Sequence, residues 1–317
     1  MTTAKQWTWR GVQFVVVALV LHWAAQTLAS QWSDVSALSA NSSIEWTWVG
    51  LASVIVLGTY AMLIQSWRML LAGWGGRLSF WQAARIWTIA NLGRYVPGKL
   101  WSIGALGVMA KREGVSGVSA ASAAILGTLL NIGAGFGILA LSGSQTLRAI
   151  SPRIGSAATV VAVLFIIGTL ALPRVLPPIL KRIAAWRSVS LPPSMLPART
   201  LWSATAMNAA SWVCYGLAFF AFAKGVTPQV VASPLLFVVI WTASYLSGYL
   251  ALIVPGGIGV REMAMGGAIV TLALGGAADA TYLALTSRVW LTVWEIAPGV
   301  FFLGRDAIAT SRGATDR

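Results

Sequence analysis

Six long apolar runs divide the chain and constrain its fold more than any other feature. Each run has the length that an α-helix needs to cross the hydrocarbon core of a bilayer, about 20 residues. The runs are residues 11–29, 46–65, 117–141, 155–172, 201–223 and 281–303. Charged residues make up only 9% of the chain, against about 25% in soluble domains. The sequence therefore predicts an all-α integral membrane protein with a single multi-pass domain over residues 1–317.

The basic residues flank the apolar runs, so the net charge of +14 does not indicate nucleic-acid binding. Fourteen Lys and Arg fall in segments that we predict to be cytoplasmic and three in external ones, as the positive-inside rule requires. Residues 174–199 are predicted to be a basic cytoplasmic loop between a first half, 46–173, and a second half, 200–303. Both termini are predicted to be cytoplasmic. A signal peptide at 11–29 is disfavoured, because that run is long for one.

Two further apolar segments are interrupted by helix-breaking residues and charges. Residues 79–110 carry basic residues at both ends, and each arm is too short to cross. We expect a re-entrant helical hairpin that enters from the cytoplasm and breaks at 94–99. Residues 234–274 are predicted to form a second hairpin, which enters from outside and breaks at 254–262. The helix-breaking residues are Pro97, Gly98, Pro255, Gly256, Gly257 and Gly259.

The two hairpins enter from opposite sides, so the halves are predicted to form an inverted repeat. The tripeptide Val-Pro-Gly occurs at 96–98 and again at 254–256. Interrupted segments at corresponding positions of two halves indicate the binding site of a transporter. The predicted fold therefore has about six full transmembrane helices and two broken hairpins. A count of eight spans is the alternative, because the arm 234–254 is long enough to cross.

Cations outnumber acids among the charges predicted to lie at membrane depth. An unpaired cation at the bilayer centre costs about 2.5–3.5 kcal/mol, so the excess predicts a visiting anion, and a lipid phosphate is the obvious candidate. Arg85 is instead expected to extend to the cytoplasmic surface. The charges at depth are the cations Arg94, Lys99, Arg261 and Arg288 and the acids Glu262 and Glu295.

Arg261 is the cation whose surroundings most need an explanation. It follows Gly259, where a half-helix is predicted to begin, and a cation at a helix N-terminus is unfavourable whereas Glu262 is favourable. Two interpretations stay open. Arg261 either pairs structurally with Glu262 or Glu295, or it binds a substrate anion. Arg288 lies seven residues before Glu295, so both share one helix face and extend the predicted network.

Few residues are available for catalysis or metal binding. The chain has one histidine, His22, and one cysteine, Cys214, which disfavours metal sites and a Ser-His-Asp triad and excludes a disulfide framework. No GxxxxGK[ST] motif occurs. We expect no cofactor, no metal and no enzyme activity. Asn131 and Asn208 are expected to bond neighbouring helices, and most of the 17 tryptophans to anchor span ends at the membrane interface.

Three motifs resemble those of the flippase-like membrane proteins related to the transmembrane domain of lysylphosphatidylglycerol synthetases. They are Asn-Leu-Gly-Arg-Tyr-Val-Pro-Gly-Lys at 91–99, Lys-Arg-Glu-Gly at 111–114 and Val-Pro-Gly-Gly-Ile-Gly-Val-Arg-Glu at 254–262. The resemblance covers roughly residues 50–300. It implies a multi-pass protein of the bacterial inner (plasma) membrane that acts in lipid or glycolipid metabolism. Some members move anionic or aminoacylated lipids between leaflets.

The chain also departs from that family in two ways. The family often has Gly-Glu shortly after the first Pro-Gly, where this chain has Trp101 and Ser102. No soluble acyltransferase domain follows residue 303, so we do not expect lipid aminoacylation.

The leading hypothesis is translocation or binding of an anionic or aminoacylated lipid or glycolipid headgroup between leaflets, without ATP. The four cations at depth would bind the headgroup, and the two acids would couple transport to protons or serve structure. The alternative is a non-transporting accessory subunit that partners an enzyme of a lipid or glycan pathway. An integral-membrane glycosyltransferase is less favoured, because the external acids Asp34, Glu45 and Asp279 lie on separate loops.

Overall fold

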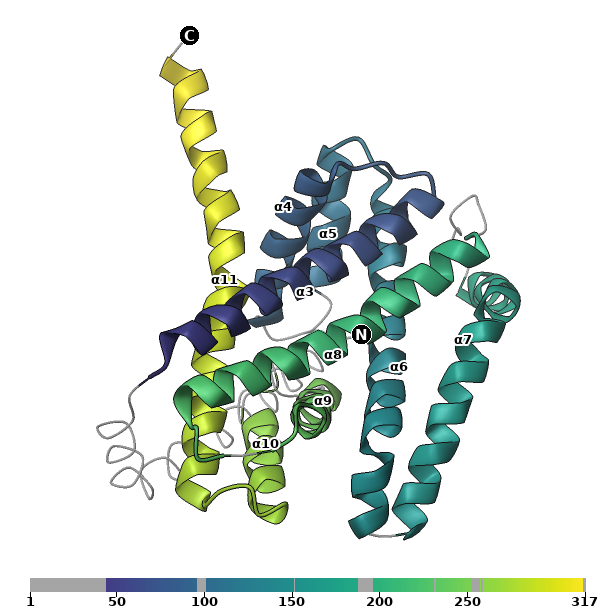
Figure 1. Cartoon of the computed structure of the whole chain (residues 1–317). Coiled ribbons are helices and arrows are strands. Elements are labelled where there is room, and N and C mark those ends of the chain that lie inside the picture. The colour runs from purple at the N-terminus through teal and green to yellow at the C-terminus, as the bar shows by residue number, and fades with distance from the viewer. Residues whose placement is uncertain are drawn as a thin grey trace, which may run out of the picture. The chain divides into compact units, whose positions relative to one another are not determined.

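The computed structural model describes residues 44–95, 101–150, 152–187, 196–230, 232–251, 257 and 259–315. All regular structure in these ranges is helical, and no strand occurs in them (Figure 1). The all-α prediction is thereby confirmed. The predicted span at 11–29 and His22 lie outside the described residues.

Four helices of the described part are long and apolar enough to cross a membrane. They are α3 (Trp46–Gly73), α6 (Gly117–Ile150), α7 (Pro152–Arg187) and α8 (Ala198–Val226). All four coincide with apolar runs predicted from the sequence, and the chain is a multi-pass membrane protein. The last predicted span, 281–303, lies within the 39-residue helix α11 (Ala277–Thr315). That helix carries more charge and is not one of the four.

Helix α7 continues beyond its predicted end, so the predicted loop at 174–199 is helical as far as Arg187. Three prolines, Pro173, Pro177 and Pro178, lie inside the helix. A proline leaves the carbonyl four residues earlier without its helical donor. For Pro173 that carbonyl belongs to Thr169, and it accepts a hydrogen bond from Trp202 Nε1 on α8 at 3.0 Å. The neighbouring helix therefore supplies the donor that this proline removes, as is common in membrane helices.

The chain forms two compact units. Of the described residues, one unit contains those up to Val56, Arg94 and Tyr95, and those from Tyr215 to Trp294. The other contains Leu57–Gly93, those between Leu100 and Cys214, and those after Trp294. The predicted halves 46–173 and 200–303 concern the repeat in the sequence and stay a prediction.

The first interrupted segment is a helical hairpin, as predicted. Helix α4 (Phe80–Asn91) ends in the short 3-10 helix η1 (Leu92–Tyr95), and α5 (Trp101–Arg112) returns beside α4 (Figure 1). Each arm of 12 residues spans about 18 Å, too short for a hydrocarbon core of about 30 Å. The arms approach closely at the break, where a Cβ on Gly93 would lie 3.2 Å from the backbone nitrogen of Ser102.

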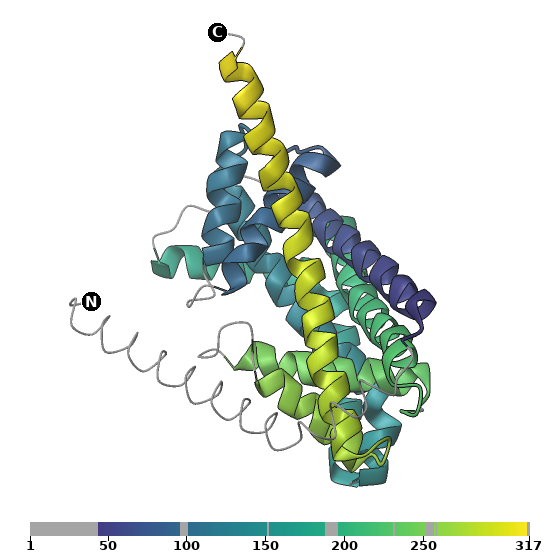
Figure 2. The same ribbon diagram turned by 90° about the vertical axis from the view of Figure 1, so that its left-hand side faces the viewer.

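The second interrupted segment has the same organisation. Helix α9 (Pro234–Leu250) and helix α10 (Val260–Thr271) pack against each other on either side of the break (Figure 2). With 17 residues, α9 spans about 26 Å and ends before the predicted limit at residue 254. The membrane side from which each hairpin enters, and with it the inverted repeat, stays a prediction.

Asn131 and Asn208 join three helices of one unit, which confirms their predicted structural role. Asn131 Nδ2 donates to Asn208 Oδ1 at 3.0 Å, and Asn208 Nδ2 donates to Ser66 Oγ on α3 at 2.9 Å. Trp212 Nε1 donates to the Asn131 carbonyl at 2.8 Å. These polar groups bond one another inside the helix packing, as expected at membrane depth.

Candidate functional site

The break between α9 and α10 depends on glycines that no other residue replaces without strain. Gly257 and Gly259 have φ values of +65° and +85°, a conformation that costs other residues about 1–2 kcal/mol. A Cβ on Gly257 would also lie 2.7 Å from the carbonyl oxygen of Gly248. The chain after α9 therefore folds back against α9 itself. The other two predicted helix-breaking residues here, Pro255 and Gly256, lie outside the described residues.

Glu262 closes the first turn of α10. Its Oε2 accepts a hydrogen bond from the backbone N–H of Gly259 at 2.6 Å. The carboxylate thus satisfies one of the amides that a helix N-terminus exposes and lies where the helix dipole favours negative charge. The prediction that Glu262 complements this helix end agrees with the geometry.

The second oxygen of Glu262 faces a cation on α11. Arg288 Nε lies 3.6 Å from Glu262 Oε1, and the two side chains are 15% and 13% exposed. Part of the predicted charge network is therefore present, with Arg288 as a partner of Glu262. The pairing of Arg261 with Glu295 stays a prediction.

Arg261 is buried against aromatic rings. Only 3% of the residue is exposed. Its guanidinium carbon lies 4.2 Å from the ring centroid of Trp241 and 4.9 Å from that of Tyr245. A desolvated cation–π contact contributes about 2 kcal/mol, and two such contacts offset much of the cost of burying this cation. Sequence reasoning singled out Arg261 but missed both rings, although their spacing of four residues on α9 puts them on one helix face.

A third ring supports this pair. Tyr215 on α8 stacks on Trp241 at a centroid distance of 5.8 Å and an interplanar angle of 18°. Tyr215 also stacks on Tyr245 at 6.3 Å and 22°. The rings beneath the guanidinium are therefore held in place by a second helix. We call Trp241 and Tyr245, with Tyr215 beside them, the aromatic cradle of Arg261.

The first break is described only in part. Pro97, Gly98 and Lys99 lie outside the described residues, and so does the side chain of Arg94. Their assignment to headgroup binding stays a prediction.

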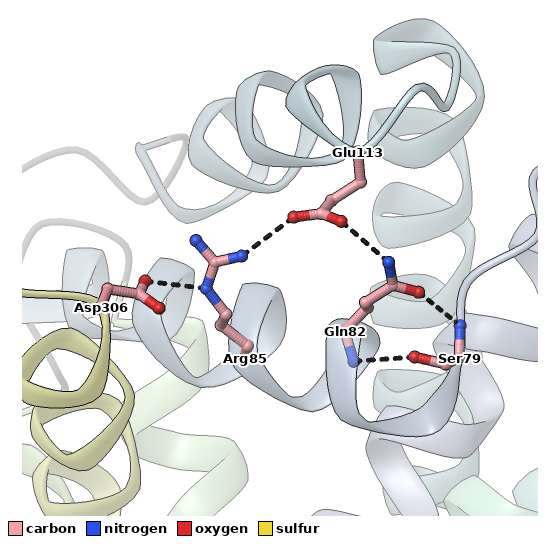
Figure 3. A network of polar contacts seen from close by, with 5 residues as sticks. All are labelled: Ser79, Gln82, Arg85, Glu113 and Asp306. Atoms are coloured by element: carbon pink, nitrogen blue, oxygen red, sulfur yellow. Dashed lines mark hydrogen bonds and ion pairs between the residues drawn. The ribbon is translucent and has the colours of Figure 1, made fainter. Parts of the chain in front are cut away.

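Arg85 in the first hairpin has two carboxylate partners. Its Nη1 donates to Glu113 Oε1 at 2.9 Å, and its Nε donates to Asp306 Oδ2 at 2.8 Å (Figure 3). Arg85 therefore ties α4 to the turn after α5 and to the C-terminal part of α11. The extension of Arg85 to the cytoplasmic surface stays a prediction, and sequence reasoning missed its two acidic partners.

A capping box extends this network. Ser79 Oγ accepts from the backbone N–H of Gln82, and Gln82 Oε1 accepts from that of Ser79, at 3.3 and 2.9 Å (Figure 3). Gln82 Nε2 also donates to Glu113 Oε2 at 2.9 Å. The pair Ser79 and Gln82, three residues apart before an apolar run, is the sequence signal that sequence reasoning passed over.

In the described ranges, no three His, Cys, Asp or Glu side chains lie together as a metal site requires. The acids that the structure does bring close to other charges serve ion pairs and helix ends. Two arginines of the described part, Arg85 and Arg261, thus have different surroundings, and each lies in a different unit.

Comparison with known proteins places the chain in a family. A family model, the lysylphosphatidylglycerol synthase transmembrane region, matches residues 12–299. No curated protein matches the chain. The matched region includes both hairpins, the cradle and Arg261, and it confirms the resemblance drawn from the three motifs. The chain belongs to the family of the lysylphosphatidylglycerol synthase transmembrane region.

Proposed function

We propose that this protein binds the anionic headgroup of a membrane lipid at Arg261 and moves the lipid between leaflets without hydrolysing ATP. The single observation that carries the proposal is the position of Arg261. This arginine is 3% exposed, lies in the first turn of the half-helix α10 and has its guanidinium carbon over two aromatic rings. Membership of a family of lipid-synthase transmembrane regions supports a lipid as the ligand.

Two aromatic faces beneath Arg261 stabilise a cation at this buried position. The neighbouring acid, Glu262, is engaged by the Gly259 amide and by Arg288. A phosphodiester that enters the membrane needs a compensating cation, and a guanidinium binds phosphate through two parallel hydrogen bonds. Arg261, rather than the capped amide of Gly259, is therefore the group we assign to the headgroup.

The mechanism needs binding and movement but no covalent chemistry. The lipid gradient or an ion gradient would supply the energy. The ion pair of Arg288 and Glu262 would rearrange as the anionic headgroup enters and leaves the site. Arg94 and Lys99 would form the second headgroup site at the first break. We place the protein in a bacterial plasma membrane with both termini in the cytoplasm, which reporter fusions at each terminus would test.

Reconstituted vesicles test the proposal. Purified full-length protein is reconstituted with an acyl-chain-labelled phosphatidylglycerol, and an impermeant reductant bleaches the label in the outer leaflet. We expect wild type to expose the inner pool, and Arg261→Gln to slow exposure at least tenfold. Arg153→Gln, a change at an exposed arginine of α7, is the matched control and should behave as wild type.

The alternative role as an accessory subunit predicts a different result. Wild type would then move no lipid and would instead purify with a single pathway enzyme. Equal bleaching with wild type and with protein-free vesicles, for both phosphatidylglycerol and an aminoacylated analogue, would contradict transport.

A further inference from the structure

The cradle beneath Arg261 has a geometry that suits one cation better than another. Trp241 and Tyr245 are separated by one turn of α9, so both present a ring to the same point. The guanidinium carbon lies over both rings, at 4.2 and 4.9 Å. A planar guanidinium stacks on aromatic faces through its own face, and its N–H groups then point outward within that plane. A lysine ammonium has no such face.

The cradle is built before any ligand arrives. Trp241 is fully buried, and Tyr215 stacks on both rings at interplanar angles of 18° and 22°. Phe219 on the same face of α8 lies 5.3 Å from the Trp241 ring. Rings held on several sides lose little freedom when a ligand binds, which favours affinity.

The plane of the guanidinium then decides which anion fits. Two in-plane N–H groups match the two non-bridging oxygens of a phosphodiester. An anion bound in this way is held at a fixed angle to the cradle. The orientation of Arg261 is as important for recognition as its charge.

We propose that Trp241 and Tyr245 are positioning residues, which hold the guanidinium of Arg261 in the plane that recognises a phosphodiester monoanion. Because this role presupposes the proposed function, it names the ligand chemistry of the same site. Position 261 is then arginine-specific, and the two ring faces, not merely the volume they fill, set the affinity for the anion.

Paired variants separate the effect of a ring face from that of side-chain volume, and the effect of the cation's charge from that of its planar shape. Trp241→Leu and Tyr245→Leu remove a ring face, whereas Trp241→Phe and Tyr245→Phe keep one. Arg261→Lys keeps the charge but loses the plane. We expect each leucine variant and Arg261→Lys to weaken phosphatidylglycerol binding about thirtyfold, the effect of one desolvated cation–π contact. Both phenylalanine variants should stay within about threefold of wild type.

Binding is measured on the purified full chain in detergent by native mass spectrometry, with phosphatidylglycerol, phosphatidylcholine and inorganic phosphate as separate probes. Cradle-dependent retention of phosphatidylglycerol supports a lipid source. Cradle-dependent displacement by inorganic phosphate supports the same chemistry with a soluble source. Equal losses in Trp241→Leu and Trp241→Phe, or wild-type affinity in Arg261→Lys, would overturn the proposal.

A second measurement needs no ligand. Thermal unfolding midpoints are compared for wild type, Trp241→Leu, Arg261→Met and the double variant. If ring and cation interact, the unfolding midpoint of the double variant falls by less than the sum of the falls in the two single variants. Strict additivity would overturn the cradle even if Arg261 is needed for transport. A clear interaction, combined with no lipid movement by wild type, would support the cradle and contradict the proposed transport. Tyr245→Leu replaces Trp241→Leu in the cycle if the latter does not fold.

Discussion

Arg85 and Arg261 lie in the two interrupted hairpins and are held by opposite kinds of partner. Arg85 bonds two carboxylates, and its side chain is 31% exposed. Arg261 is 3% exposed and stacks on two aromatic rings. Two carboxylates thus neutralise the charge of Arg85, whereas two aromatic faces stabilise the charge of Arg261.

This difference underlies our proposal that Arg85 is structural and that Arg261 recognises a ligand. A guanidinium between two carboxylates has its charge cancelled locally and fastens the elements that supply them. Ring faces attract a cation through the ring quadrupole and carry no net charge themselves. The comparison therefore predicts different responses to mutation, salt and lipid at the two positions.

The largest effect is expected from a substitution that strains the backbone turn beside Arg261. Gly257→Ala forces a Cβ into a left-handed conformation and to within 2.7–2.8 Å of the Gly248 backbone, which together cost about 3 kcal/mol. Gly248 in turn faces Arg261, since a Cβ on it would lie 3.0 Å from the Arg261 Cβ. We expect a markedly lower thermal midpoint and loss of phosphatidylglycerol binding.

Gly267→Ala is the control, because this glycine lies within α10 and has open space around its Cβ position. Alanine is the better helix former there, so the midpoint should stay or rise slightly. A Gly257→Ala protein with the midpoint and lipid binding of wild type would show that this break does not shape the site.

A smaller effect, with a distinct salt dependence, is expected at the carboxylate-bound arginine. Arg85→Gln removes two partly exposed ion pairs, which contribute up to about 1 kcal/mol each. Raising the salt from about 0.1 to about 1 M shortens the screening length from roughly 10 to 3 Å. The difference in midpoint between wild type and Arg85→Gln should therefore shrink.

The same salt series on Arg261→Gln sharpens the contrast. The stack of Arg261 on its rings is buried, and buried interactions are screened much less. The difference in unfolding midpoint between wild type and Arg261→Gln should therefore stay constant as the salt concentration rises. An equal salt response at both positions would mean that the two arginines are held in the same way.

The sequence was sufficient to predict features set by local chemistry. Glycine and proline placed the two breaks, and the helices on either side of 254–262 end and begin where those residues require. Glu262 was expected at the helix N-terminus, because that preference depends on the first turn alone. The small number of charges identified Arg261 as a residue of interest before any contact was known.

Features that depend on distant partners were missed. Asp306 binds Arg85 across 221 positions of sequence, and no local pattern indicates that pairing. Trp241 was not singled out from the sequence, yet it is fully buried beneath Arg261. The continuation of α7 through Pro173 to Arg187 was not expected, and there Trp202, on another helix, bonds the carbonyl that Pro173 leaves without its helical donor.

The most direct test is the lipid that the purified protein retains. Wild type, Arg85→Gln and Arg261→Gln are purified identically from membranes, and bound lipids are extracted and quantified by mass spectrometry. Because only Arg261 is assigned to the headgroup, anionic phospholipid should be retained by wild type and Arg85→Gln and lost from Arg261→Gln, with zwitterionic lipid unchanged in all three. Equal retention of anionic lipid by all three proteins would contradict the assignment of Arg261.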